Sequence, residues 1–169
     1  AEEPEPFGDG GTKMAWNTFN VVSIYPNGNP VMSDVNQRWV GDCCACAVIA
    51  SMAYLYPRFV KHIIKDNMDK TYTVTMYDPK GKQISVGVGG DYFIGNSGDL
   101  GALGGRNKEV TWATILEKAM IKWNQIYQGS SNVGGIGTEY VSAIFTGDGE
   151  SVGFGANALI AEDLQRAVE

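Results

Sequence analysis

The sequence predicts an α+β fold, and three stretches of the 169-residue chain support this prediction. Residues 43–56 are apolar on nearly every face, residues 71–88 alternate apolar and polar side chains around a turn, and residues 112–126 repeat apolar side chains at helical spacing. Hydrophobic residues make up 44% of the chain, which is enough to build a core. The length suits one ordinary domain or two small lobes.

Residues 1–30 are predicted to form an extended, loop-rich N-terminal extension. Prolines and glycines interrupt any regular period there, at Pro4, Pro6, Gly8, Gly10, Gly11, Pro26, Gly28 and Pro30. The apolar residues within 19–25 make that stretch the candidate strand of the extension.

Residues 43–56 are predicted to form the central helix of the domain, buried on all sides, because their apolar composition leaves no polar face. Asp42 lies where an N-cap is wanted, and Pro57 stops the helix or forces a new start. A second, more polar helix is expected from Pro57 to about residue 67.

A β-hairpin is predicted after these helices, with its turn at residues 78–81. The glycine-rich residues 87–90 are expected to end it in a loop. Apolar side chains alternate with polar ones in both strands, at Tyr72, Val74 and Met76 and then at Ile84, Val86 and Val88.

An amphipathic helix is predicted over residues 112–126, where apolar side chains recur every three or four positions, and Gly129 is expected to stop it. Glycines and serines dominate the following residues through Gly137, which predicts a loop. Residues 159–168 are expected to form a last helix.

The candidate chemistry is concentrated in one stretch, Gln37-Arg38-Trp39-Val40-Gly41-Asp42-Cys43. A cysteine in the first turn of a helix lies beside partial positive charge and unpaired N–H groups, which favour the thiolate. The same N–H groups can stabilise an oxyanion that forms when the thiolate attacks a carbonyl. Gln37, on a loop just before the helix, can bring a side-chain amide donor to the same point.

This stretch resembles the active-site signature of the calpain family, which is a glutamine followed by Gly-Asp-Cys and a helix containing Ala-Ile-Ala-Ser. Residues 111–119 are similar to the family's Trp-x-x-x-Leu-Glu-Lys-Ala segment, and Phe145-Thr146-Gly147 resembles a third family element. The resemblance covers roughly residues 31–169 and keeps the family's order. It implies a papain-like α+β fold, with a helical lobe at residues 31–135 around the cysteine-bearing helix and the beginning of a β-rich second lobe at residues 136–169.

The resemblance further implies a cysteine endopeptidase that hydrolyses peptide bonds through a thioester. Cys43 would be the nucleophile and Gln37 the oxyanion-hole side chain, while Gly134 and Gly135 best match the glycine pair that hydrogen-bonds the substrate backbone. Where the family usually has tryptophan after the nucleophile, this chain has Cys44. The family's histidine and asparagine lie about 150 residues beyond the cysteine. We therefore expect a missing or separately cleaved C-terminal part to supply them.

The remaining candidate groups have ordinary interpretations. Cys44 and Cys46 are expected to be small core residues, since free cysteine is often buried. The three cysteines do not have zinc-ligand spacing, so no metal is assigned to them. His62 is the chain's one histidine. It follows the cysteine helix and is expected to lie on the surface, far from Cys43.

No cofactor is required for the predicted chemistry. The resemblance to animal calpains allows a Ca²⁺ site in glycine-rich loops, with ordinary solvated acids as the alternative. The loop acids in question are Asp9, Asp91, Asp99, Asp148 and Glu150.

Charge and hydropathy limit the partners. The net charge is -6 and no basic stretch is present, which argues against a nucleic-acid partner. No apolar run approaches the roughly 20 residues of a membrane span. A polypeptide substrate is expected, and the acidic start of the chain favours a secreted or periplasmic bacterial enzyme. The alternatives are a catalytically inactive papain-fold binding module and a transferase that uses the same thioester chemistry.

Overall fold

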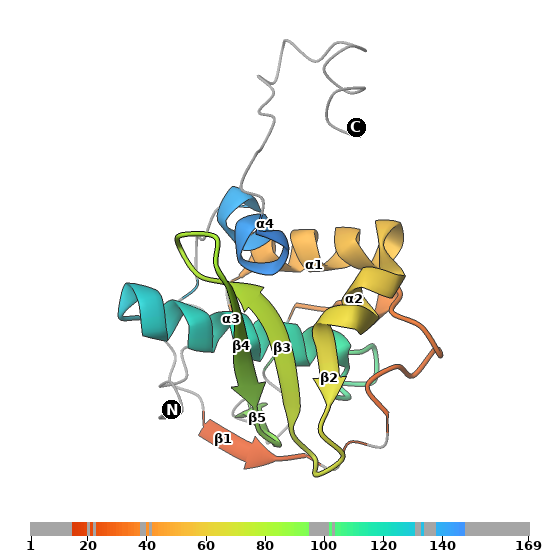
Figure 1. Cartoon of the computed structure of the whole chain (residues 1–169). Helices are drawn as coiled ribbons and strands as arrows, with labels where there is room; N and C mark the ends of the chain where they lie inside the picture. The colour runs from red at the N-terminus through yellow and green to blue at the C-terminus, as the bar shows by residue number, and fades with distance from the viewer. Residues whose placement is uncertain are drawn as a thin grey trace, which may run out of the picture.

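A computed structural model gives the structure of the chain (Figure 1). It describes residues 15–19, 21, 23–37, 40, 42–94, 102, 104–130, 133 and 138–147. These residues form an α+β arrangement of helices and two small antiparallel sheets, as predicted. The helices are η2 (Met32–Asp34), α1 (Cys43–Leu55), α2 (Pro57–Ile63), α3 (Trp112–Gln128) and α4 (Thr138–Thr146). The strands are β1 (Ala15–Thr18), β2 (Ile64–Asp66), β3 (Tyr72–Tyr77), β4 (Gln83–Val88) and β5 (Asp91–Ile94).

The larger sheet has the order β2-β3-β4 and contains the predicted hairpin. Strands β3 and β4 pair from Tyr72↔Val88 to Tyr77↔Gln83, and the inward faces of both strands are buried. The second helix is shorter than predicted, because the chain leaves α2 at Ile63 and pairs as β2 with β3. Pairing of Ile64 with Val74, ten residues further along the chain, overrides local helical preference there.

The N-terminal extension contributes a strand, but at a different place from the one predicted. Strand β1 pairs antiparallel with β5, from Ala15↔Ile94 to Thr18↔Asp91. The described residues of 19–25 form no strand, so that prediction is wrong. The chain instead turns there, with the Gly28 N–H donating to the Tyr25 carbonyl at 3.0 Å. The expectation of a loop at 87–90 is also only partly met, since Gly87 lies within β4 and β5 begins directly after Gly90.

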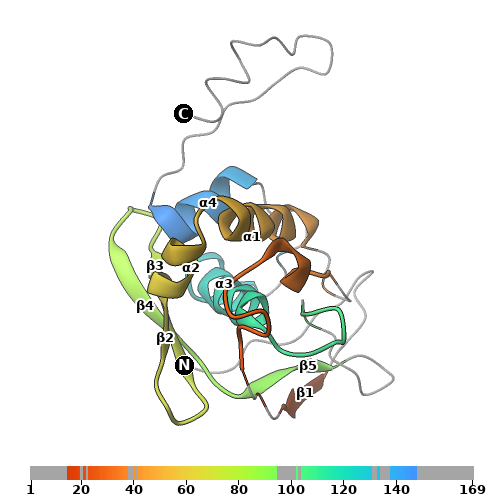
Figure 2. The same cartoon turned by 90° about the vertical axis from the view of Figure 1, so that its right-hand side faces the viewer.

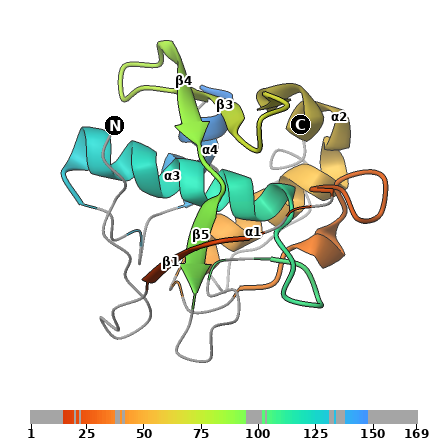
Figure 3. The same ribbon diagram turned by 90° about the horizontal axis from the view of Figure 1, so that it is seen from below.

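Helix α3 is the most deeply buried helix of the described residues. Residues 112–121 are all buried, and so are Trp123 and Asn124. The helix packs against α1 on one side and against β3 and β4 on another (Figures 1 and 2). Figure 3 shows it running across the width of the molecule. Its predicted end is confirmed, since Gly129 adopts φ 73° as the C-cap.

Helix α1 begins at Cys43 as predicted, but it is not buried on all sides. It buries Ala45, Ile49, Met52 and Ala53, whereas Cys43, Ala47, Ser51 and Tyr54 form an exposed stripe at steps of three and four residues. The prediction of a fully buried central helix is therefore wrong. No single described helix has the length and apolar character to cross a membrane, and α1 and α2 meet that test only together, across a bend of 113°.

Helix α4 was not predicted, and it packs on α1 and β3. Its buried side chains are Val141, Ile144 and Phe145. It ends at Gly147, whose φ of 77° and close approach to the Tyr77 ring require glycine. The division into lobes at 31–135 and 136–169 stays a prediction, and the helix expected at 159–168 lies outside the described residues.

Candidate active site

The loop before α1 is fixed to the first turn of α3 by a buried carboxylate. Asp34 is 2% exposed and accepts three hydrogen bonds, from Trp112 Nε1 at 2.8 Å, Asn27 Nδ2 at 2.9 Å and the Val31 N–H at 3.2 Å. The Thr111 hydroxyl donates to the Asp34 carbonyl at 3.4 Å. Trp112 is the first residue of the Trp-x-x-x-Leu-Glu-Lys-Ala segment, so this motif positions the approach to the cysteine.

A second attachment lies immediately before Gln37. Asn36 and Gly104 exchange backbone hydrogen bonds at 3.0 and 3.2 Å, and Asn36 Nδ2 also donates to the Ser33 carbonyl at 2.9 Å. This isolated antiparallel bridge holds the chain at the residue before Gln37. The start of the site loop is therefore set by backbone pairing with a distant segment.

The Gln37 side chain folds over the turn that enters α1. Gln37 Nε2 donates to the Val40 carbonyl at 2.9 Å, and the Asp42 N–H donates to the same oxygen at 2.9 Å. Gln37 is exposed. A primary amide carries two N–H donors, so the bond to Val40 uses one of them. The catalytic role of Gln37 stays a prediction.

Cys43 is the first residue of α1, and its side chain is exposed. The N–H groups of a first helical turn have no partner within the helix and carry the positive end of its dipole. A carbonyl oxygen placed against the same turn would find donors. These are the requirements for attack on an acyl group.

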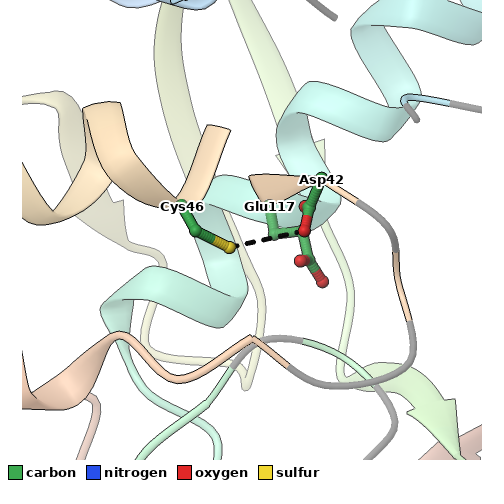
Figure 4. Close-up of side chains that lie close together, drawn as sticks. All are labelled: Asp42, Cys46 and Glu117. Carbon is green, nitrogen blue, oxygen red and sulfur yellow. Dashed lines mark hydrogen bonds between the residues drawn. The ribbon is translucent and has the colours of Figure 1, made fainter. Parts of the chain in front are cut away.

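Asp42 was expected to cap α1, but its side chain turns inward instead. It makes no capping hydrogen bond to α1. Asp42 is 1% exposed, and its Oδ1 accepts a hydrogen bond from Cys46 Sγ at 3.4 Å (Figure 4). Glu117 of α3, also 1% exposed, completes a cluster in which one ligating atom of each residue lies within 4.8 Å of the others. We call Asp42, Cys46 and Glu117 the buried acidic cluster.

This cluster affects the protonation state of the Cys46 thiol. Burial raises the pKa of the Cys46 thiol well above its ordinary value, and the charges of Asp42 and Glu117 raise the same pKa further. The thiol therefore keeps its proton at neutral pH and is a poor nucleophile. Cys44 and Cys46 were both expected in the core, and both are partly buried. Cys43 is the exposed cysteine of the three.

The buried acidic cluster is also the one group of three potential metal ligands found among the described residues. It offers one thiol and two carboxylates, whereas Ca²⁺ takes six to eight oxygen ligands. Of the five loop acids considered for calcium, the structure describes Asp91, whose carboxylate accepts a hydrogen bond from the Thr18 hydroxyl. The other four lie outside the described residues. A calcium site stays a prediction.

His62 lies on the surface, as predicted. It belongs to α2 and is exposed. Cys43 begins α1 and α2 follows the other end of that 13-residue helix. At about 1.5 Å per residue, α1 is about 18 Å long, and α2 follows it after a bend of 113°. Gly134 and Gly135 lie outside the described residues, so their role stays a prediction.

Sequence reasoning missed what Glu117 and Lys118 do. Glu117 lies in the buried acidic cluster under the start of α1. Lys118 is 3% exposed, and its Nζ donates to the Asp91 carbonyl and lies 4.5 Å from the centroid of the Trp16 ring. Two adjacent charged residues inside an otherwise buried helix are the signal that could have indicated these contacts, because buried charges need partners.

A family model described as calpain family cysteine protease matches residues 16–158. No curated protein matches the chain. The matched region contains the Gln37–Cys43 loop, both motif helices and the hairpin between them.

Proposed function

Because the chain belongs to the calpain family of cysteine proteases, we propose that it carries the nucleophile of a cysteine endopeptidase, and that this nucleophile is Cys43. A peptidase of this family acts on polypeptides. The finer assignment, an endopeptidase that works through a thioester on Cys43, rests on the surroundings of the three cysteines.

One observation carries the proposal. Cys43 is exposed in the first turn of α1, whereas Cys46, one turn further along, donates its S–H to a buried carboxylate. A helix start favours the thiolate, and a buried acidic environment opposes it. The same helix therefore separates a thiol suited to attack from a thiol that stays protonated.

The proposed reaction follows the two-step logic of thiol acyl transfer. The Cys43 thiolate attacks the carbonyl carbon, and the carbonyl electron pair moves to oxygen, where the Cys43 N–H and the Gln37 amide donate hydrogen bonds. Collapse of this intermediate expels the amine, which takes a proton from a histidinium. Water then cleaves the thioester, giving up its proton to the histidine and releasing the carboxylic acid product and free Cys43.

The histidine and its orienting asparagine are proposed to come from outside this sequence. The chain's one histidine, His62, is exposed on α2, the helix that follows the far end of α1. A general base must reach within hydrogen-bond distance of the proton it accepts, directly or through one water. A C-terminal part of the protein or a separate polypeptide would supply both residues.

Alkylation tests the assignment of the nucleophile. Brief treatment with iodoacetamide at pH 7.5, followed by peptide mapping, should modify Cys43 before Cys44 and Cys46. The Cys46→Ala variant should be labelled at the same rate as the wild-type chain, and Cys43→Ala should lose the fast phase. Preferential modification of Cys46 in folded protein would contradict the proposal. A fast Cys43 that never turns over substrate, even with the histidine present, would favour an inactive binding module.

A further inference from the structure

A groove lies at the end of α1 opposite Cys43, between the chain before α1 and helix α2. Its volume is about 580 Å³. That size falls within the range of roughly 300–1,000 Å³ found for ligand sites. Its lining includes Met32, Tyr54, Arg58 and Lys61. We call this the Arg58–Lys61 groove. Figure 1 shows the chain before α1 passing beside α2.

The groove combines apolar surface with two cations. Met32 and Tyr54 are large hydrophobic side chains that are 51% and 71% exposed. Arg58 and Lys61 lie three residues apart on α2, so they project from the same side of the helix. Lys61 Nζ lies 5.2 Å from the centroid of the Tyr25 ring. Among the described residues, no carboxylate pairs with either cation.

The Arg58–Lys61 groove carries positive charge, whereas the chain as a whole is negatively charged. The protein carries a net charge of -6. A positive pair beside exposed methionine and tyrosine is complementary to a ligand that presents acidic groups next to apolar ones. A polypeptide segment with alternating acidic and apolar side chains has this chemistry. Inorganic phosphate would use the cations and leave the apolar surface without a partner.

We propose that the Arg58–Lys61 groove binds an acidic, apolar-containing segment of the polypeptide substrate, away from the bond that is cut. This inference rests on the proposed function, since it supposes that Cys43 marks the cleavage point. Tyr54 lies eleven residues after Cys43 on α1, which at 1.5 Å per residue is about 16 Å. An extended chain covers about 3.3 Å per residue. The acidic segment must therefore lie at least about five residues from the scissile bond.

Binding can be measured without any cleavage. The probe is a fluorescein-labelled octapeptide of alternating glutamate and leucine, followed by fluorescence polarisation with the Cys43→Ala chain. The test variant carries Arg58→Gln and Lys61→Gln. The matched control carries Lys80→Gln and Lys82→Gln, which removes the same charge from the exposed β3–β4 turn.

The test variant should bind the probe between about threefold and twentyfold more weakly, since exposed ion pairs contribute up to about fivefold each. The control should bind like the parent chain, and the difference should shrink at 300 mM salt because the charges are screened. Equal binding by test and control variants would overturn the proposal. So would equal affinity for a glutamine–leucine peptide, or displacement of the probe by an equal concentration of inorganic phosphate, which would indicate an anion site only.

A second measurement separates this inference from the proposed function. In the complete enzyme, an acidic cluster placed eight residues from the scissile bond should raise kcat/KM, and the same cluster placed two residues away should not. The gain should disappear in the Arg58→Gln, Lys61→Gln variant, while cleavage of short neutral peptides stays unchanged. Probe binding involves no cleavage, so it would test the groove even if Cys43 proved not to be the nucleophile.

Discussion

Cys43 and Cys46 lie one turn apart on α1, and their surroundings differ. Cys43 is exposed at the helix start, while Cys46 faces inward to Asp42 and Glu117. The two buried carboxylates disfavour ionisation of the Cys46 thiol, because its thiolate would place another negative charge beside them. The fold thus leaves Cys43 exposed and keeps the neighbouring Cys46 thiol protonated.

The buried thiol predicts a dependence of stability on pH. The folded-state pKa of Cys46 is raised above its value in the unfolded chain, so the unfolded state releases the thiol proton first as the pH increases. The contribution of Cys46 to stability is fully present below the unfolded pKa of about 8.5 and is lost as the pH rises above that value. In urea unfolding with reductant, going from pH 7.5 to 9.5 should cost the wild-type chain about 1 kcal/mol more than Cys46→Ala.

The Cys43→Ala variant is the control, because it should keep the wild-type slope. The half-buried Tyr25, whose pKa is raised to about 12, is present in all three proteins and cancels from the comparison. Identical pH slopes for wild type and Cys46→Ala would mean that the Cys46 thiol ionises as easily in the folded state as in the unfolded chain.

Gln37 is expected to matter for turnover and little for stability. Its side chain is exposed and donates to the Val40 carbonyl. Loss of one oxyanion donor costs on the order of 10²-fold in kcat. In the complete enzyme, Gln37→Ala should lower kcat by about that factor and leave Tm nearly unchanged. An unchanged kcat with a normal Tm would remove Gln37 from the mechanism.

At the scale of elements, α1 and α3 show what the sequence could predict and what it could not. Both helices were predicted close to their observed bounds, and so was the start of α1 at Cys43. Helix α1 was predicted to be the fully buried one, whereas α3 is the more deeply buried of the two. The small apolar residues of α1 give no polar face, so nothing in the pattern indicates its solvent-facing stripe.

The burial of several polar residues on α3 was not predicted either. An amphipathic pattern suggests that they face solvent, but they are buried because each has a specific contact. Lys118 donates to the Asp91 carbonyl, Asn124 donates to the Ser130 carbonyl at 2.7 Å, and Glu117 lies in the buried acidic cluster. Such contacts depend on segments brought together by folding, and the inward turn of Asp42 toward α3 escaped prediction for the same reason.

The attachment of the site loop to α3 can be tested with two tryptophans. Trp112 Nε1 donates to the buried Asp34 carboxylate at 2.8 Å, and Trp123 Nε1 donates to the Tyr77 carbonyl at the same distance. Hydrogen bonds to charged groups contribute about 1.5–3 kcal/mol, against about 1 kcal/mol for neutral ones. Trp112→Phe should therefore lower the free energy of unfolding by about 1 kcal/mol more than Trp123→Phe in urea titrations. Equal losses in the free energy of unfolding would show that the hydrogen bond to Asp34 contributes no more than the one to the Tyr77 carbonyl.

At the scale of the whole molecule, nucleophile and base are expected to come from different parts of the protein. Cys43 lies at one end of the exposed stripe of α1, which continues through Ala47 and Ser51 to Tyr54. His62 lies on α2, which follows the other end after a bend of 113°. A proton acceptor for Cys43 would therefore approach from the solvent side of the helix start, where the described residues include no histidine.

Complementation tests this expectation. The chain alone should be alkylated at Cys43 but should hydrolyse a fluorogenic peptide at least about 10²-fold more slowly than the chain with the encoded segment that follows it, because general acid–base catalysis contributes 10²–10⁴-fold. The segment can be co-expressed or added as a second polypeptide. Replacing its histidines by alanine should abolish the gain, whereas His62→Ala in the chain itself should not.

Denaturing gels and mass spectrometry of the active material would identify each polypeptide in it. Full hydrolysis by the chain alone, or loss of activity in a folded His62→Ala variant, would place the base inside this sequence and contradict the division.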